Sequence, residues 1–405
     1  MEQRGADLVR VASATSQPIV DPSSAATEFL PLCRPDIGIA EVEELLDAIR
    51  SGWVTTGPKV ELLERRLAEY VGVDHVRCLS SCTAGLLLAL KVSGIGPGDE
   101  VLVPTLTFVS CANVVEHLGA RPVFVDCEPD SGLIDLDAAE RLIGPATRAV
   151  IAVHLAGRPL DMDRVNSLRD QHGLVVVEDA AHAIGAEWNG RRVGAHGNLT
   201  SFSFHATKNM TTFEGGALVV PDAATCDRVR QLSLHGLSRS SWSRHGRAGA
   251  DAYDVLEPGY KFGMHDVAAA VGIHQLSRLD GWIERRAELA HRYDEQLEGL
   301  PLDRAPQVTP GARHAHHLYP VRLTDAAPLP RDDVAEALRV AGIGSSVHFR
   351  PIHTLSYYAE RSGLKPDDLP AARGLATRLL SLPLFPQMSE DDVDRVSTTL
   401  ASLLT

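Results

Sequence analysis

Short β-branched apolar runs alternate with amphipathic stretches along the first two thirds of the chain. The clearest run is Leu174-Val175-Val176-Val177, whose length and branching are typical of a strand buried on both faces. Comparable strand patterns occupy residues 75–79, 100–103, 122–126, 148–154, 200–205 and 217–220, and helical patterns occupy residues 39–50, 59–70, 110–117, 136–143 and 162–171. Strands that alternate with helices imply crossover connections, so we predict an α/β fold with a mainly parallel sheet.

The pattern changes after residue 264. Residues 265–297 read as one long helix or as two helices broken near Gly281, and a strand (316–323), a helix (330–340), a strand (346–349) and a terminal helix (389–404) follow. This order predicts a smaller α+β domain at the C-terminus. We therefore divide the chain into a flexible tail rich in Ser, Ala and Thr (1–28), a large domain (29–275) and a small C-terminal domain (276–405).

Composition and net charge indicate which classes of binding partner the protein can have. The chain has 405 residues, enough for two domains, and a formal net charge of −14. We expect no nucleic acid partner, because no overall basic field exists to replace counterions, although a phosphorylated small molecule needs only local cations. We expect no membrane span either, because no apolar run is long enough, and the N-terminus lacks a secretory pattern. These features favour the cytoplasm.

Cysteine and histidine spacing argues against a metal site. The six cysteines show no CxxC or His–Cys ligand spacing, so we expect reduced thiols rather than disulfides or zinc. The HFRPIH segment at 348–353 has no carboxylate or cysteine at ligand spacing. We expect no bound metal.

Two residues of opposite charge follow neighbouring strand patterns. Asp179 stands at the end of the strand that begins at Leu174, and Lys208 follows the strand at 200–205. The carboxyl ends of parallel strands form the ligand-binding edge of such a sheet, so the two side chains could share a pocket. A lysine that forms a Schiff base and an acid that holds a pyridine nitrogen protonated suit pyridoxal phosphate. Taken singly, however, such an Asp is more often a helix cap and such a Lys a surface charge.

The start of the next helix offers an anion site. Ser80-Ser81-Cys82-Thr83 leads from the strand at 75–79 into the helical run AGLLLAL. Free amides and the positive end of the helix dipole suit a cofactor phosphate there. Simple N-capping is the alternative interpretation.

Longer motifs add a resemblance to a known family. DAAHAIGA and FSFHATKNMTTFEGGAL occur together with SGWVTTGP, SSCTAGLLLAL, PTLTFVSCANVV, VHLAGRPLDMD, PGYKFGMHDVAAAVG, HFRPIH and SLPLFP. In this order, over roughly residues 30–400, they resemble the DegT-type (DegT/DnrJ) sugar aminotransferase family. The resemblance implies the aspartate aminotransferase-like, PLP-dependent fold, with a mainly parallel sheet sandwiched by helices and a smaller α+β C-terminal domain.

The resemblance also assigns roles to residues around the cofactor. It implies that Lys208 carries pyridoxal 5'-phosphate as an internal aldimine and that Asp179 faces the pyridine nitrogen. The other cofactor contacts that it implies are Thr83 and Ala84, Cys82 (where the family usually has glycine), Phe108 over the ring, His182, Ser203, and Lys261 reaching the phosphate of a neighbouring subunit. The last contact implies a homodimer whose active site lies at the subunit interface.

Substrate contacts follow less directly from the same motifs. The resemblance places Thr56, His348 and Arg350 near the substrate, and Arg239, in a polar arginine-bearing stretch, suits a nucleotide diphosphate. Gly263 stands where family members often carry Asn or Arg.

The function that the resemblance implies is transamination, because the members that dehydrate carry histidine at the position of Lys208. We expect an amino group to pass from L-glutamate, through pyridoxamine phosphate, to a nucleotide-diphosphate-linked keto sugar. The HFRPIHTLSYY segment favours a 4-keto-6-deoxy sugar, in antibiotic or glycan biosynthesis. A cyclitol ketone, as in aminoglycoside pathways, and a non-catalytic regulatory or binding member of the fold are the alternatives.

Overall fold

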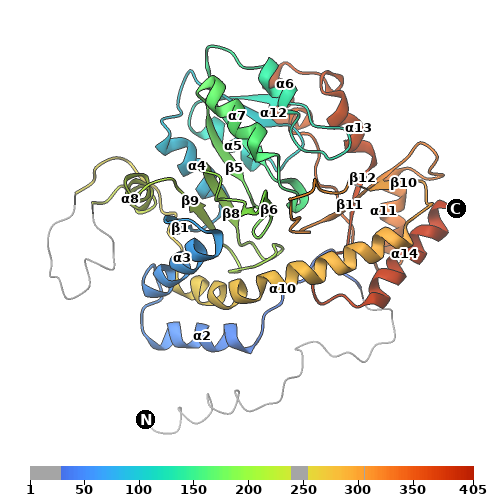
Figure 1. Ribbon diagram of the computed structural model, residues 1–405, viewed down its shortest axis with the longest axis horizontal. Helices are drawn as coiled ribbons and strands as arrows, with labels where there is room; N and C mark the ends of the chain where they lie inside the picture. Colours follow the sequence, from blue (N-terminus) through green and yellow to red (C-terminus); the bar gives the residue numbers. More distant parts are fainter. Residues whose placement is uncertain (1–28, 239–253, 305) are drawn as a thin grey trace, which may run out of the picture.

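The structure, a computed structural model, describes residues 29–238, 254–304 and 306–405. The predicted N-terminal tail and Arg239 lie outside these residues. The described chain has the predicted mixed α/β architecture, with one large sheet, a smaller sheet and a long helix that runs beneath both (Figure 1).

The large sheet has seven strands and is mostly parallel. Its spatial order is β1 (Val76–Leu79), β9 (Gly216–Val219), β8 (Leu199–Ser203), β5 (Val175–Asp179), β4 (Thr147–Val153), β2 (Glu100–Pro104) and β3 (Arg121–Val125). The strands β8, β5, β4, β2 and β3 run parallel, whereas β9 runs antiparallel to both of its neighbours. The carboxyl ends of β5 and β8, with Asp179 and Ser203, therefore lie at the same edge.

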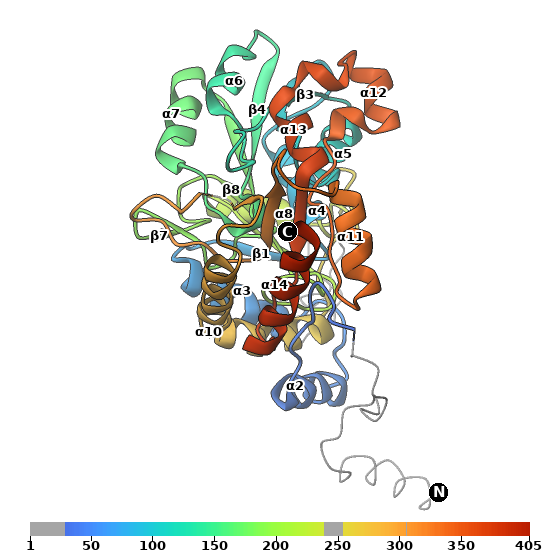
Figure 2. The ribbon, with the colours of Figure 1, turned by 90° about the vertical axis from the view of Figure 1, so that its right-hand side faces the viewer.

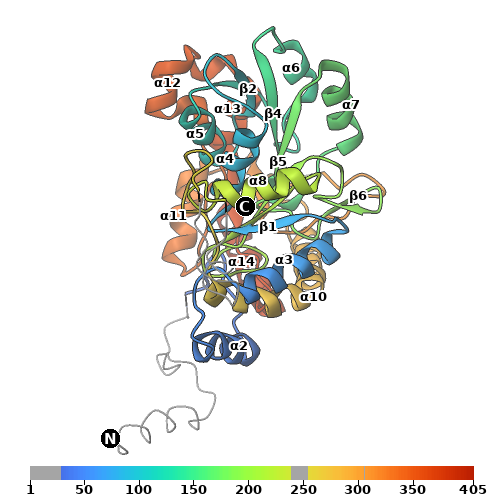
Figure 3. The same cartoon turned by 90° about the vertical axis from the view of Figure 1, so that its left-hand side faces the viewer.

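Helices cover both faces of this sheet, which explains the continuous apolar strands. Ala149 and Ile151 of β4 face one core, and Val150 and Ala152 face another. The helices of the large unit are α2 (Ile39–Arg50), α3 (Pro58–Val71), α4 (Cys82–Val92), α5 (Ser110–His117), α6 (Leu136–Arg141), α7 (Met162–His172) and α8 (Ala223–Leu232). Figure 3 shows α4, α5 and α8 close together, and their side chains share the first of these cores.

Helix α4 lies unusually close to the sheet. A Cβ added at Gly85 would stand 2.2 Å from Ser201 Oγ, and one added at Gly216 would stand 2.5 Å from the backbone nitrogen of Cys82. Only glycine allows both approaches, so these two residues fix the start of α4 against β8 and β9.

The C-terminal unit is built on a three-stranded antiparallel sheet. Its order is β10 (Leu302–Arg304), β11 (Tyr319–Leu323) and β12 (Leu379–Leu382). The helices α11 (Arg331–Val340), α12 (Ser356–Ser362), α13 (Pro370–Arg378) and α14 (Glu390–Leu404) complete the unit, and Figure 2 shows α11, α13 and α14 on one side of the molecule. The remaining short elements are the hairpin β6 (Glu187–Trp188) and β7 (Arg191–Arg192) and the 3-10 turns η2 (Leu155–Gly157), η3 (Ile352–Thr354) and η4 (Pro366–Asp368).

The strand predicted at residues 346–349 is wrong. Ser346 makes an isolated bridge with Ser381, and the chain then leaves the sheet. His348 does not continue a ladder, and its Nδ1 lies within hydrogen-bond distance of Ser381 Oγ (3.0 Å). Two of the four residues, His348 and Phe349, line a cavity.

The long segment after residue 264 is one helix. Helix α10 (Asp266–Gln296) has 31 residues and continues through Gly281, where an added Cβ would meet no atom within 4 Å. Its first part packs on α2 and α3, and a later part packs on α14 (Figure 1). The predicted boundary at residue 275 falls inside α10, and Leu30 belongs to the core of the C-terminal unit, so the domain limits stay a prediction.

Among the described residues, no helix combines the length and the apolar character that crossing a bilayer requires.

Candidate active site

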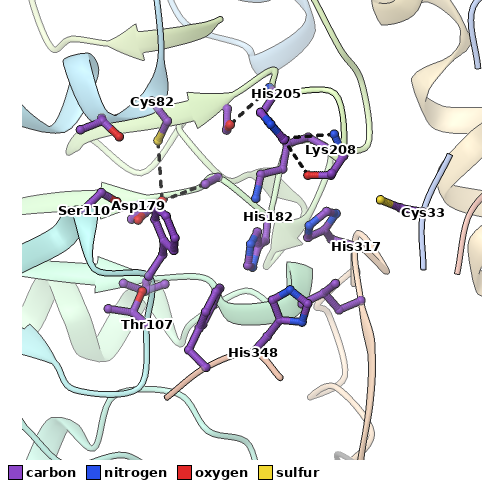
Figure 4. A pocket seen from close by; sticks show the side chains of 18 of the residues that line it. Cys33, Cys82, Thr107, Ser110, Asp179, His182, His205, Lys208, His317 and His348 are labelled. Atoms are coloured by element: carbon purple, nitrogen blue, oxygen red, sulfur yellow. Dashed lines mark hydrogen bonds between the residues drawn. The ribbon is translucent and has the colours of Figure 1, made fainter. Parts of the chain in front are cut away.

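A cavity of about 360 Å³ opens at the carboxyl edge of the large sheet. The ends of β5 and β8 and the start of α4 form one side, and segments next to β11 and β12 close the other. Figure 4 shows Lys208, Asp179 and the rings of His182, His317 and His348 around this space. The two units of the chain thus enclose one site.

Asp179 is buried at the end of β5, with 5% of its surface exposed. Its Oδ1 accepts a hydrogen bond from the backbone of Ala181 (3.0 Å), and its Oδ2 accepts one from the thiol of Cys111 (3.0 Å). The thiol of Cys82 lies 3.8 Å from Oδ1. Both carboxylate oxygens are therefore paired with a donor, as a buried polar group requires.

Lys208 follows β8 in a turn that its backbone nitrogen closes on the carbonyl of His205 (2.9 Å). Burial lowers the pKa of the lysine, and the negative charge of Asp179 opposes this shift. A larger share of its amine is therefore neutral at physiological pH than in a free lysine, as a nucleophile or proton acceptor requires.

The start of α4 forms an anion cradle beside these two residues. Ser81 caps the helix by accepting a hydrogen bond from Ala84 N (3.1 Å), while the Cys82 and Thr83 amides have no acceptor within the helix. Thr83 is exposed and lines the cavity, and so does Ser203 at the end of β8. A helix start with hydroxyl groups around it binds a phosphate well.

Two buried histidines present opposite polar atoms. His182 Nδ1 accepts a hydrogen bond from Ala156 N (3.2 Å), so the neutral ring carries its proton on Nε2. His317 Nδ1 donates to Asn209 Oδ1 (3.0 Å), and Asn209 is itself fixed because it donates to Ala315 O (2.7 Å), so His317 Nε2 is an acceptor. Burial, with the charge of Lys208, holds the pKa of both rings well below its usual range.

An aromatic wall completes the cavity. The ring of Phe349 stacks 5.9 Å from His182 and lies 6.0 Å from Phe108, between centroids. His348 precedes it, and burial together with the charge of Lys208 lowers its pKa to about 4. A flat apolar surface next to fixed polar atoms suits a planar ligand with a polar edge.

The structure brings together most of the site residues expected from the sequence. The residues that line the cavity are Cys82, Thr83, Phe108, Asp179, His182, Ser203, Lys208 and His348. Ala84 lies just behind it in the first turn of α4.

The other expected residues lie apart from the described lining. Thr56 donates from Oγ1 to the carbonyl of Met264 (2.6 Å), and Lys261 and Arg350 are exposed. Arg239 lies outside the described residues.

Several lining residues were not expected from the sequence. They include Leu32, Cys33, Thr107, Ser110, His205, Thr207, Glu214, His317 and Phe349. Thr107 had a local signal, because it precedes the expected Phe108, and Ser81 of the predicted anion site also lines the cavity. His317 had none, since its role depends on Asn209, which lies 108 positions away along the chain.

The donor set fits pyridoxal phosphate. Its aldehyde is matched by a partly buried amine, and its ring nitrogen by a buried carboxylate. Its ring is matched by an aromatic wall, and its phosphate by a helix start with hydroxyls. Among the described residues, no group of three or more His, Cys, Asp or Glu side chains is arranged to hold a metal ion.

Known proteins share this architecture. The sequence model of the DegT/DnrJ/EryC1/StrS aminotransferase family matches residues 35–401. The spore coat polysaccharide biosynthesis protein SpsC of Bacillus subtilis is 45% identical over 370 residues, which cover 91% of this chain and 95% of SpsC.

Solved structures agree with the sequence matches. Spr1654 of Streptococcus pneumoniae in its PMP form superimposes with a TM-score of 0.87 at 34% identity, over 92% of this chain and 98% of that one, and a PLP form is also known. DesV of S. venezuelae, in complex with a ketimine intermediate, gives a TM-score of 0.84 at 34% identity, over 93% and 98% of the two chains.

Proposed function

The chain belongs to the DegT/DnrJ/EryC1/StrS aminotransferase family, and on this premise we propose that it transfers an amino group from L-glutamate to a nucleotide-diphosphate-linked keto sugar. The family and its solved members make it a sugar aminotransferase, and the PLP and PMP forms among these members support dependence on pyridoxal phosphate. The observation that carries the proposal is the cavity itself, which is lined by both a lysine of lowered pKa and a buried carboxylate.

Each residue of the site has a separate role in the proposed reaction. When bound, pyridoxal phosphate supplies an aldehyde for the amine and a ring that accepts electrons. Nζ of Lys208 accepts the proton from the α-carbon of the amino donor, which its lowered pKa favours. Asp179 holds negative charge at the ring nitrogen, and Thr83, Ser203 and the amides of α4 bind the phosphate.

The histidines orient the polar edge of the ligand. The Nε2 of His182 donates a hydrogen bond, and the Nε2 of His317 accepts one. His348 faces the substrate side from the C-terminal unit, and a second cavity of about 40 Å³ shares His348 with the first and is lined by the buried Arg158. A guanidinium so close to the site supports an acceptor that carries negative charge.

The choice of acceptor rests on relatives. SpsC is named for polysaccharide biosynthesis, and another neighbour, PseC of Helicobacter pylori, is an aminotransferase of pseudoaminic acid biosynthesis. Both support a sugar, and the HFRPIHTLSYY segment still favours amination at carbon 4. All six cysteines are free thiols, which suits the reducing cytoplasm.

We propose that two copies complete the site. Ile39, Val42, Leu46 and Ile49 lie at spacings of 3, 4 and 3 on α2 and are 72%, 42%, 41% and 52% exposed. An apolar stripe of this kind on a helix is typical of a subunit interface. Lys261 is exposed and does not line the cavity of its own chain, which supports a role for it at the phosphate in the partner's site.

An absorption spectrum with a Lys208→Ala variant tests the proposal. The purified protein with pyridoxal phosphate should show a visible band that L-glutamate converts to the pyridoxamine absorbance, and the variant should lack this conversion. The glutamate-treated protein should then aminate a nucleotide-linked 4-keto-6-deoxy sugar. Conversion with a free cyclitol ketone alone would establish the other acceptor, and a wild-type protein that never shows the band would refute the proposal.

A further inference from the structure

Two thiols contact the carboxylate of Asp179, and of these Cys82 lines the cavity whereas Cys111 does not. Cys111 belongs to the first turn of α5 and is fully buried, and Cys82 begins α4. Cys111 Sγ lies 3.0 Å from Asp179 Oδ2, while Cys82 Sγ lies 3.8 Å from Oδ1 and 3.5 Å from the carbonyl of Ser201. Cys82 therefore divides its single proton between two acceptors, and Cys111 makes the shorter contact.

The direction of the hydrogen bonds around Cys111 follows from proton count. An ionised carboxylate can only accept, so Cys111 donates its single proton to Asp179. The Thr107 hydroxyl lies 3.6 Å from Cys111 Sγ and must then be the donor in that contact. A chain runs from the Thr107 O–H through the Cys111 S–H to Asp179.

The thiol keeps its proton at physiological pH. Burial and the charge of Asp179 hold the pKa of Cys111 well above its usual range. Cys111 is therefore a steady donor rather than a reactive thiolate.

We propose that Cys111 is a positioning residue that fixes the orientation of the Asp179 carboxylate towards the cofactor. The backbone of Ala181 holds Oδ1 and Cys111 holds Oδ2, so the carboxylate cannot rotate without losing a donor. A donor to the charged form also offsets the cost of burying that charge. This inference rests on the proposed role of Asp179 at the pyridine nitrogen.

Cofactor titration of the apoprotein is the first test. Cys111→Ala should bind pyridoxal phosphate about tenfold more weakly, because one donor to a buried charge is lost. Cys111→Ser keeps a donor of similar size and should bind within about twofold of the wild type. Cys127→Ala is the matched control, since Cys127 is equally buried but packs in a different core cluster, and its affinity should not change.

Infrared spectroscopy of the cofactor-free protein is the second test. The S–H stretching band that a Cys111→Ser difference spectrum assigns to Cys111 should move to higher frequency in Asp179→Asn, because an amide is a weaker acceptor than a carboxylate. This arm does not require Cys111→Ala to fold. An unmoved band, or wild-type affinity in a folded Cys111→Ala protein, would overturn the inference. A wild type that fails to bind pyridoxal phosphate would instead refute the proposed function, while the infrared band still reports on the contact.

Discussion

The imidazole rings around Lys208 are neutral at physiological pH because burial and the charge of the lysine act in the same direction. This holds for His182, His317 and His348, and neutral rings can offer one donor and one acceptor each. The cavity therefore recognises polar groups through fixed hydrogen bonds and leaves the mobile proton to Lys208.

This burial predicts a pH-dependent stability. The pKa of His348 is about 4 in the folded protein and about 6.5 when unfolded, so between these values the unfolded chain binds more protons. The contribution of the neutral His348 ring to the free energy of unfolding is fully present above about pH 6.5 and is lost as the pH falls towards about 4. Its upper limit is about 3 kcal/mol. Urea unfolding of His348→Gln should show a smaller loss of unfolding free energy over this window than the wild type.

His291→Gln is the control for this experiment. His291 lies on α10 with its side chain 75% exposed, so its removal should leave the acid dependence unchanged. Equal pH profiles for wild type and His348→Gln would contradict the prediction.

Residue patterns identified the two charged groups of the site but not the network that holds them. Asp179 and Lys208 were predictable because each follows a strand whose end is visible in the sequence. The partners in this network lie far apart along the chain and come into contact only in the folded sheet. Examples are the pair Asn209 and His317 and the pair Cys111 and Asp179. Nothing in local periodicity reports such contacts.

At the level of elements, one arginine of α10 forms hydrogen bonds to two of the segments that line the cavity. The Nη1 of Arg286 donates to the carbonyls of Leu384 (2.6 Å), His316 (3.4 Å) and His317 (3.4 Å). The guanidinium is buried, and burial lowers its pKa to about 10. The pKa still exceeds physiological pH, so the side chain stays charged and serves three backbone acceptors.

We predict that Arg286→Met lowers the free energy of unfolding by about 1–3 kcal/mol, because buried carbonyls lose their donor. Affinity for pyridoxal phosphate should fall as well, since His317 and Leu384 line the site. Arg285→Met is the matched control. Arg285 is the neighbouring residue, pairs with the exposed Glu288 and donates to one partly buried carbonyl, that of Met388 (3.0 Å), whereas Arg286 serves three carbonyls. Its loss should therefore cost less, about 1 kcal/mol. Equal stability of the two variants would contradict the assignment.

Helices and strands were predicted correctly where the apolar periodicity extends over many residues. The prediction failed where tertiary contacts determine the local structure. The helices α2 and α5 have the limits expected from their apolar spacing. The segment at 346–349 has strand-like residues, yet His348 and Phe349 line the cavity. The strand β12 was not predicted, and only its last two residues belong to the SLPLFP motif. A short apolar run does not reveal which strand or which cavity its side chains will contact in the folded protein.

For the whole molecule, the apolar stripe on α2 predicts a dimer that charge can disrupt. Val42→Asp combined with Leu46→Asp should shift the mass measured by light scattering from dimer to monomer, because a charge at an apolar interface is left without a partner. Val340→Asp is the control, since Val340 is 73% exposed at the end of α11. A wild type that is monomeric at high concentration would refute the dimer.

Helix α10 has a consequence for how this chain can change in length. It is continuous for 31 residues and touches α2 and α3 at one end and α14 towards the other. In a helix each residue adds about 100° of rotation, so one residue inserted near Gly281 would turn Arg286 and Tyr293 away from their acceptors. Insertions in surface loops cost little free energy, but the length of α10 fixes the angle between the two walls of the active site.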